Sequence, residues 1–111
     1  MTAETHYISI DLQREAVDQF DGTTLLDFGA NWCGYCKAAQ PLVDAALAGH
    51  SQLRHLKIED GPGRRLGRSF GVKLWPTLIF LRQGREIARL VRPAEVVALR
   101  QALEQLEGLP E

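Results

Sequence analysis

The chain has 111 residues, of which 45% are hydrophobic and 24% charged, and its net charge is −1. This length predicts one globular domain, residues 1–111, with a core large enough to need no disulfide. No apolar run could span a membrane, the polar N-terminus lacks a signal-peptide pattern, and no basic stripe suggests nucleic acid. We therefore expect a cytoplasmic protein, or a periplasmic one if an export signal preceded Met1.

The first half of the chain predicts two strands and two helices. Residues 7–10 alternate weakly as a first strand, followed by an amphipathic helix over 12–20 with Asp11 as its N-cap. Residues 23–28 are typical of a buried strand, and a second helix is expected from 33 to 49. The chain thus begins with the order β-α-β-α.

The second half predicts three strands and two helices. Residues 53–58 alternate apolar and polar side chains as a third strand does, a short helix over 64–70 follows, and 77–81 form a strongly apolar strand. A tight turn leads into a strand over 86–91, and Pro93 suits the first turn of a last, amphipathic helix. We expect parallel strands joined by helices, and then an antiparallel hairpin.

The only two cysteines of the chain stand three positions apart, in the motif Trp32-Cys33-Gly34-Tyr35-Cys36-Lys37. One helical turn separates them, so both sulfur atoms would lie on one face near the helix start, close enough to bond to each other. The partial positive charge of a helix N-terminus stabilises a thiolate there. Cys33 is therefore the predicted nucleophile, and Cys36 the thiol that resolves its mixed disulfide.

This motif and its surroundings resemble the thioredoxin family. The resemblance rests on Asp27 in a strand, the motif over 32–37 at the strand-to-helix junction, Pro41 in the helix and residues 75–77 downstream. It implies an α/β protein with the thioredoxin fold, whose central mixed sheet follows the order β-α-β-α-β-α-β-β-α with helices on both faces.

The resemblance also implies roles for single residues. Asp27 would be the buried carboxylate beneath Cys36, able to take its proton during resolution, although a strand-end aspartate exposed to water is the alternative. Trp75 and Pro76 open a strand, where proline makes a cis peptide in a tight turn reasonable. In the family the backbone of the residue before this proline pairs with an extended substrate segment. A merely structural turn proline remains the alternative.

Further residues are expected to contact substrate. Trp32, Tyr35 and Trp75 would form an apolar collar around Cys33, with core packing as the alternative for Trp32. Gly34 and Thr77 complete the predicted substrate-binding surface.

Charge is unevenly spread, with −5 over residues 1–63 and +4 over 64–111. Ordinary solvated faces explain such a pattern. Alternatively, Lys73 and Arg92, near the two loops that flank the active site in the family, would favour acidic partner surfaces.

The histidines pose a separate question. His55 stands about where many relatives carry a lysine near the carboxylate, but we expect it to be a surface strand residue. Cys33, Cys36, His50 and His55 match the written spacing of a zinc site. The helix between Cys36 and His50 would hold them roughly 21 Å apart, too far for one metal ion. We expect no metal.

Three positions depart from the family pattern: Gly29 replaces the usual tryptophan, Tyr35 a proline and Arg92 a glycine. A Gly-Tyr pair between the cysteines resembles bacterial disulfide isomerases, which leaves the direction of electron flow open. We predict a thiol-disulfide oxidoreductase that reduces protein disulfides through a Cys33/Cys36 dithiol cycle, as a monomer with no bound cofactor.

The expected partners are disulfide-containing proteins and a reductase or other dithiol donor. Two alternatives remain open: an isomerase or oxidant acting on exported proteins, and a redox-inactive binding module that keeps the fold.

Overall fold

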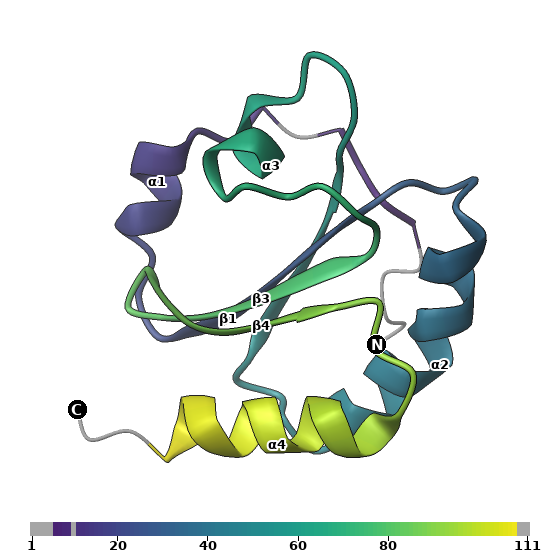
Figure 1. Cartoon of the computed structure of the whole chain (residues 1–111). Helices are drawn as coiled ribbons and strands as arrows, with labels where there is room; N and C mark the ends of the chain where they lie inside the picture. The colour runs from purple at the N-terminus through teal and green to yellow at the C-terminus, as the bar shows by residue number, and fades with distance from the viewer. Residues whose placement is uncertain (1–5, 10, 109–111) are drawn as a thin grey trace.

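The computed structural model describes residues 6–9 and 11–108, and it contains a four-stranded mixed sheet (Figure 1). The strands lie in the order β2-β1-β3-β4. Parallel pairing joins β1 to β2, whereas β3 is antiparallel to both β1 and β4. Their bounds are Thr23–Gly29 for β1, Arg54–Glu59 for β2, Thr77–Arg82 for β3 and Arg85–Val91 for β4.

The direction of β3 corrects the expectation that the strands before the hairpin are parallel. Glu59 at the end of β2 pairs with Gly29, and Thr77 at the start of β3 pairs with Phe28. The chain therefore leaves β2 and enters β3 at the same end of the sheet, where β1 ends. The only helix in the connection between them is the short α3 (Arg65–Ser69), and it does not return the chain to the opposite end of the strands.

Helices cover both faces of the sheet, as the sequence predicted. In Figure 1, α1 and α3 lie on one side of the sheet and α4 on the other, with α2 packed beside α4. The new bounds are Arg14–Asp18 for α1, Gly34–Leu47 for α2 and Val96–Glu107 for α4. Among the described residues, no helix is long and apolar enough to cross a membrane.

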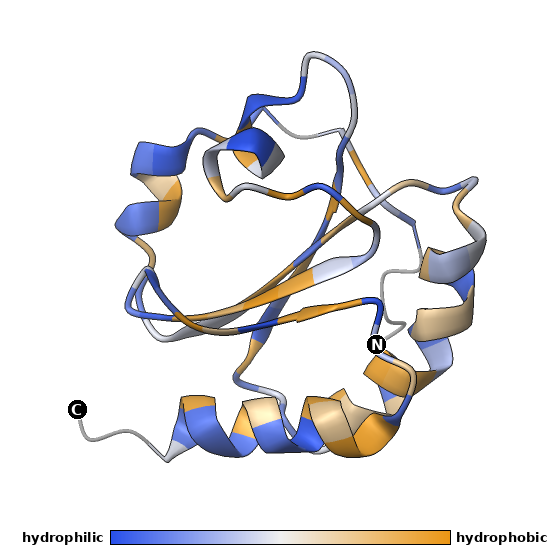
Figure 2. Ribbon diagram, in the orientation of Figure 1, coloured by the Kyte–Doolittle hydropathy of each residue, from blue (hydrophilic) through white to orange (hydrophobic). Residues whose placement is uncertain are grey.

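Alternation along the strands divides the core into two apolar clusters. Leu25 points towards α2 and α4, where it packs with Phe80 and Leu99. Leu26 points the other way and packs with Val17 and other residues of the α1 and α3 side. In Figure 2 much of the central sheet is coloured hydrophobic, whereas the helices carry both hydrophobic and hydrophilic segments. Asp27 follows two positions after Leu25, so it shares the face that α2 covers.

The expected first strand is reduced to one isolated bridge. Ile8 pairs with Ile58 of β2, while Ile10 lies outside the described residues. The backbone N–H of Tyr7 donates to the Asn31 side chain over 2.8 Å, and Asn31 donates back to the Tyr7 carbonyl over 3.1 Å. These two bonds fix the backbone of Tyr7 to Asn31, in the loop that follows β1.

Two predicted helix starts are also wrong. The first helix begins at Arg14 with Gln13 as its N-cap, so Asp11 does not cap it. The last helix begins at Val96, beyond Pro93. At Arg92 the backbone has φ 51° and its N–H donates to Pro76, which turns the chain before the helix can begin.

Candidate active site

The two cysteines lie where β1 passes into α2. Cys33 is the N-cap of α2, and its Sγ accepts a hydrogen bond from the backbone N–H of Cys36 over 3.2 Å. A helix of 14 residues begins there, and its terminal N–H groups favour negative charge on the sulfur. Both thiols are free. Cys33 thus lies at the helix start, as expected, and its role as the nucleophile stays a prediction.

The two thiols are both buried but differ in their surroundings, since Cys36 lies one turn further along α2. Burial of the thiol is the main cause, and its hydrogen bond with Cys33 the second, that raises the pKa of Cys36 to about 11. Hydrogen bonds with the Ala30 backbone and the Tyr7 side chain act in the opposite direction. Cys36 therefore stays protonated at neutral pH and needs a base before it can act as a nucleophile.

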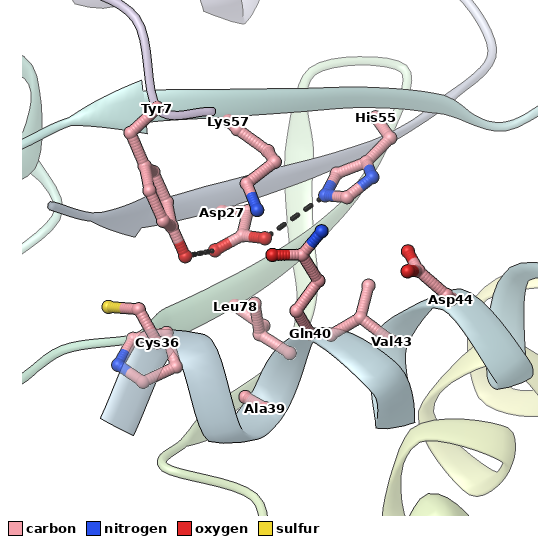
Figure 3. A pocket seen from close by; sticks show the side chains of 11 residues that line it. Tyr7, Asp27, Cys36, Ala39, Gln40, Val43, Asp44, His55, Lys57 and Leu78 are labelled. Atoms are coloured by element: carbon pink, nitrogen blue, oxygen red, sulfur yellow. Dashed lines mark hydrogen bonds and ion pairs between the residues drawn. The ribbon is translucent and has the colours of Figure 1, made fainter. Parts of the chain in front are cut away.

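Asp27 is the buried acid that the sequence predicted, and the alternative of a solvated strand-end residue is wrong. Its residue surface is 2% exposed. Figure 3 shows its two partners: the Tyr7 hydroxyl donates to Oδ1 over 2.7 Å, and Nε2 of His55 lies 3.1 Å from Oδ2. A buried carboxylate without such partners would be strongly destabilising.

His55 is not the surface residue that the sequence suggested, because its side chain is 19% exposed and contacts Asp27. The lysine near the carboxylate is Lys57, two residues further along β2 and directly opposite Asp27 in the sheet register. Lys57 is buried, with its ammonium 4.4 Å from the centre of the Tyr7 ring. The two-residue spacing places His55 and Lys57 on one face of β2, a signal that sequence reasoning had available.

Tyr7 is the residue of this site that the sequence did not indicate, and Gly29 explains how it enters the site. A Cβ at Gly29 would lie 2.6 Å from the Cys36 sulfur and 2.7 Å from Cζ of Tyr7. The missing side chain at Gly29, noted above as a departure from the family, therefore leaves the space that the Tyr7 ring fills. We name Tyr7, Asp27, His55 and Lys57 the buried polar cluster.

The outer side of the motif carries the apolar collar. Trp32 is 75% exposed, which excludes core packing for it, and its ring meets Trp75 edge-on at 5.5 Å. Tyr35 is also exposed. The Arg92 guanidinium lies 3.8 Å over the Tyr35 ring, and Arg92 Nε donates to the Trp75 carbonyl over 2.8 Å. Gly34 is exposed between the collar residues.

The loop before β3 has the predicted cis peptide between Trp75 and Pro76. Thr77 follows as the first residue of β3, but its side chain is buried and donates to the Leu74 carbonyl over 2.6 Å. Thr77 therefore holds the shape of this loop from inside and does not present its side chain at the surface.

The histidines of the considered zinc site lie in different places. His50 contacts Glu107 over 3.0 Å near the ends of α2 and α4, whereas His55 contacts Asp27. Within residues 6–9 and 11–108, no three His, Cys, Asp or Glu side chains gather as metal ligands.

A mixed sheet with helices on both faces and a CxxC dithiol at the start of α2 define the thioredoxin-fold class of dithiol proteins. The sequence profile of the family described as Thioredoxin matches residues 6–105, so the chain belongs to the thioredoxin family. It is a thiol-disulfide oxidoreductase, and members of this family generally reduce disulfide-containing proteins.

Individual relatives support this assignment. The solved structure of reduced thioredoxin 2 from Pseudomonas aeruginosa PAO1 is 52% identical, with a TM-score of 0.86 over 96% of this chain and 98% of that chain. A thioredoxin of Chlamydia muridarum is 39% identical over 70 residues, 63% of this chain and 69% of its own. Thioredoxin 1 of Nostoc is 26% identical over 95% of this chain and 98% of its own.

Proposed function

We propose that this chain reduces disulfides of partner proteins through a cycle of Cys33 and Cys36. The thiolate of Cys33 attacks one sulfur of the substrate disulfide, and the other sulfur leaves as a thiolate. Cys36 then attacks the Cys33 sulfur, so that the protein becomes oxidised and the substrate leaves reduced. The observation that carries this proposal is the Cys33 sulfur at the N-terminus of α2, accepting the Cys36 N–H.

In this proposal Asp27 is the base for the second attack. Cys36 is held protonated by burial, which raises its pKa to about 11, and its proton must leave before it can attack. Asp27 is the buried carboxylate on the face of the sheet that carries α2. His55 connects that carboxylate to solvent, because its side chain remains 19% exposed.

The proposed substrate surface is the apolar collar together with Gly34 and the loop at Pro76. An extended substrate segment would lie along this loop and pair with the Trp75 backbone, as in strand addition. Thr77 contributes by fixing the loop through its bond to the Leu74 carbonyl. Aromatic side chains exposed around a nucleophile supply contact area without sequence-specific polar demands.

Arg92 belongs to this surface as a selector of partners. Its guanidinium covers Tyr35 and bonds the Trp75 carbonyl, so an approaching substrate meets a positive charge beside the nucleophile. Lys73 is exposed on the same loop as Trp75. Positive charges at the edge of a site raise the encounter rate with acidic surfaces. We therefore propose acidic substrates or an acidic reductase.

We further propose a cytoplasmic, monomeric, single-domain protein that receives electrons from a reductase or other dithiol donor. Support comes from the bacterial thioredoxins among its relatives. An isomerase or oxidant is the second candidate, because Tyr35 stands between the cysteines where reducing members usually have proline.

The reduction potential of the Cys33/Cys36 pair separates these candidates. A value of about −270 mV is expected for a reductant, whereas about −180 to −120 mV would indicate an isomerase or oxidant. The assay is equilibration with glutathione buffers, followed by thiol counting. A variant with both cysteines changed to serine is the control: it should lose reduction of insulin disulfides. If that variant still bound its partner proteins as tightly as the wild type, the chain would be a binding module.

A further inference from the structure

The Tyr7 hydroxyl lies inside the active site although Tyr7 comes from the N-terminal segment. The residue is 6% exposed, and its hydroxyl donates to Oδ1 of Asp27 over 2.7 Å. Reaching this place requires the empty position at Gly29, where a Cβ would lie 2.7 Å from the ring. Asn31 fixes the segment by bonding both backbone groups of Tyr7.

This position puts a phenol between the resolving thiol and its base. Both oxygens of Asp27 already have partners, Tyr7 on Oδ1 and His55 on Oδ2. The Cys36 sulfur lies 2.6 Å from the point where a Gly29 Cβ would stand, beside the oxygen-bearing end of the Tyr7 ring. Figure 3 shows the Tyr7 hydroxyl directed between the Cys36 sulfur and the Asp27 carboxylate.

We propose that the Tyr7 hydroxyl relays the proton from Cys36 to Asp27 when the mixed disulfide is resolved. This inference rests on the proposed Cys33/Cys36 cycle. As Cys36 attacks the Cys33 sulfur, its thiol proton passes to the Tyr7 oxygen while the Tyr7 proton passes to Oδ1 of Asp27. The Cys33–Cys36 bond forms, the Cys33–substrate bond breaks, and the substrate sulfur leaves as a thiolate with the bonding electron pair.

The chemistry of the cluster suits a relay that never stores charge on the phenol. A hydroxyl accepts and donates hydrogen bonds at once, so one proton can arrive as another departs. Burial, and to a lesser degree the charge of Asp27, raises the pKa of Tyr7 far above its usual value. This excludes a phenolate form of Tyr7 as a populated intermediate. After resolution, the proton on Asp27 has an exit through His55, whose side chain reaches solvent.

The test separates attack from resolution. A symmetrical aryl disulfide that releases a coloured thiolate gives one release when Cys33 attacks and a second when Cys36 resolves. Tyr7→Phe keeps the ring and removes the hydroxyl. We expect the first release at the wild-type rate and the second slowed by about 100-fold or more, since a positioned proton-transfer group typically contributes about 10²-fold to 10⁴-fold. Ser9 lies on the same segment as Tyr7, but its hydroxyl faces Arg64. Ser9→Ala should therefore leave both releases unchanged.

A double substitution tests whether Tyr7 acts through Asp27. Asp27→Asn keeps a hydrogen-bond acceptor for the phenol but removes the base. Adding Tyr7→Phe to Asp27→Asn should slow resolution no further, because both changes interrupt one route. The relay would be overturned if the double variant slowed the second release by the product of the two single effects, or if Tyr7→Phe alone left the second release unchanged. A missing first release in the wild-type protein would instead contradict the proposed function.

Should Tyr7→Phe fail to fold, Asn31→Ala provides a second test, since it keeps the Tyr7 hydroxyl but removes the side chain that holds the Tyr7 backbone and so lets the hydroxyl move away from Asp27. A slower second release with an unchanged first release supports the relay. Resolution at the wild-type rate in Asn31→Ala, with Tyr7→Phe unfolded, would show that Tyr7 serves packing alone.

Discussion

The two sides of the CxxC turn have opposite characters. The outer side, formed by the apolar collar and Arg92, is open to solvent, with Trp32 75% and Tyr35 59% exposed. On the inner side, the buried polar cluster holds Asp27 at 2% exposure. The proposed chemistry divides in the same way: we assign contact with a partner to the outer side, and transfer of the Cys36 proton to the inner side.

This contrast follows from the geometry of one helix start. Cys33 caps α2 at the boundary between the two sides, while Cys36, one turn later, points at the sheet. Polar groups can remain on the inner side because Asp27 bonds both Tyr7 and His55. Substitutions on the outer side should therefore change partner rates, and those on the inner side should change resolution or stability.

The largest effect is expected at the cysteines themselves, which belong to both sides. Cys33→Ser should abolish disulfide reduction, because no nucleophile remains to begin the cycle. Cys36→Ser should keep the attack and accumulate a mixed disulfide with the substrate. Mass spectrometry of the trapped adduct is the measurement. Accumulation in Cys33→Ser and not in Cys36→Ser would reverse the two roles.

Thiol labelling sharpens the comparison without a substitution. Because burial raises the pKa of Cys36 to about 11, only about one Cys36 thiol in ten thousand is ionised at pH 7. Iodoacetamide should label Cys33 first at neutral pH, and labelling of Cys36 should accelerate as the pH rises towards 11. Peptide mapping after timed quenching measures both rates. Equal labelling at neutral pH would show that the two thiols do not differ as described.

Gly29→Ala should damage the inner side through packing. The new Cβ would lie 2.6 Å from the Cys36 sulfur and 2.7 Å from the Tyr7 ring, so at least one must move. Overpacking of this kind costs about 1–3 kcal/mol, which thermal unfolding would detect as a lower melting temperature.

Gly34→Ala is the matched stability control for this change, since its added Cβ would meet no heavy atom within 4 Å beyond its chain neighbours and its own helix backbone, and alanine suits a helix start. Wild-type stability in Gly29→Ala would mean that Tyr7 is not held against Gly29.

Arg92→Gly should have the smallest effect, confined to partner choice on the outer side. Glycine adopts the φ of 51° without strain, while the cation–π contact with the Tyr35 ring and the hydrogen bond to the Trp75 carbonyl are lost. We expect several-fold faster reduction by a general thioredoxin reductase and slower reaction with an acidic partner. The difference should shrink with salt, because charges are screened over about 8 Å near physiological ionic strength.

The measurement is the ratio of the two second-order rates at low and high salt. Arg85→Gln removes one positive charge at the opposite end of β4 and should leave the ratio unchanged. The same ratio in Arg92→Gly and wild type would assign Arg92 to the solvated surface.

Much of the site could be predicted from local patterns in the sequence. The spacing of Cys33 and Cys36 beside a helix start indicates a dithiol, and an acid within an apolar strand indicates the buried Asp27. The order of strands and helices was predicted as well, apart from the first strand. Such features depend on residues a few positions apart, whose relative placement the periodicity of strands and helices determines.

Tertiary structure alone decided what surrounds these residues. Tyr7 and Asp27 are 20 positions apart, and Asp27 and His55 are 28 apart, so no local period relates them. The direction of β3 and the bond from Arg92 to Trp75 likewise depend on where the chain returns to the sheet. Tyr7 reaches Asp27 because Gly29 has no side chain, Asn31 holds the backbone of the N-terminal segment, and Ile8 pairs with β2. The residues that impose these conditions lie far apart in the sequence. They come together only when the sheet has formed and the N-terminal segment has packed against its edge strand β2.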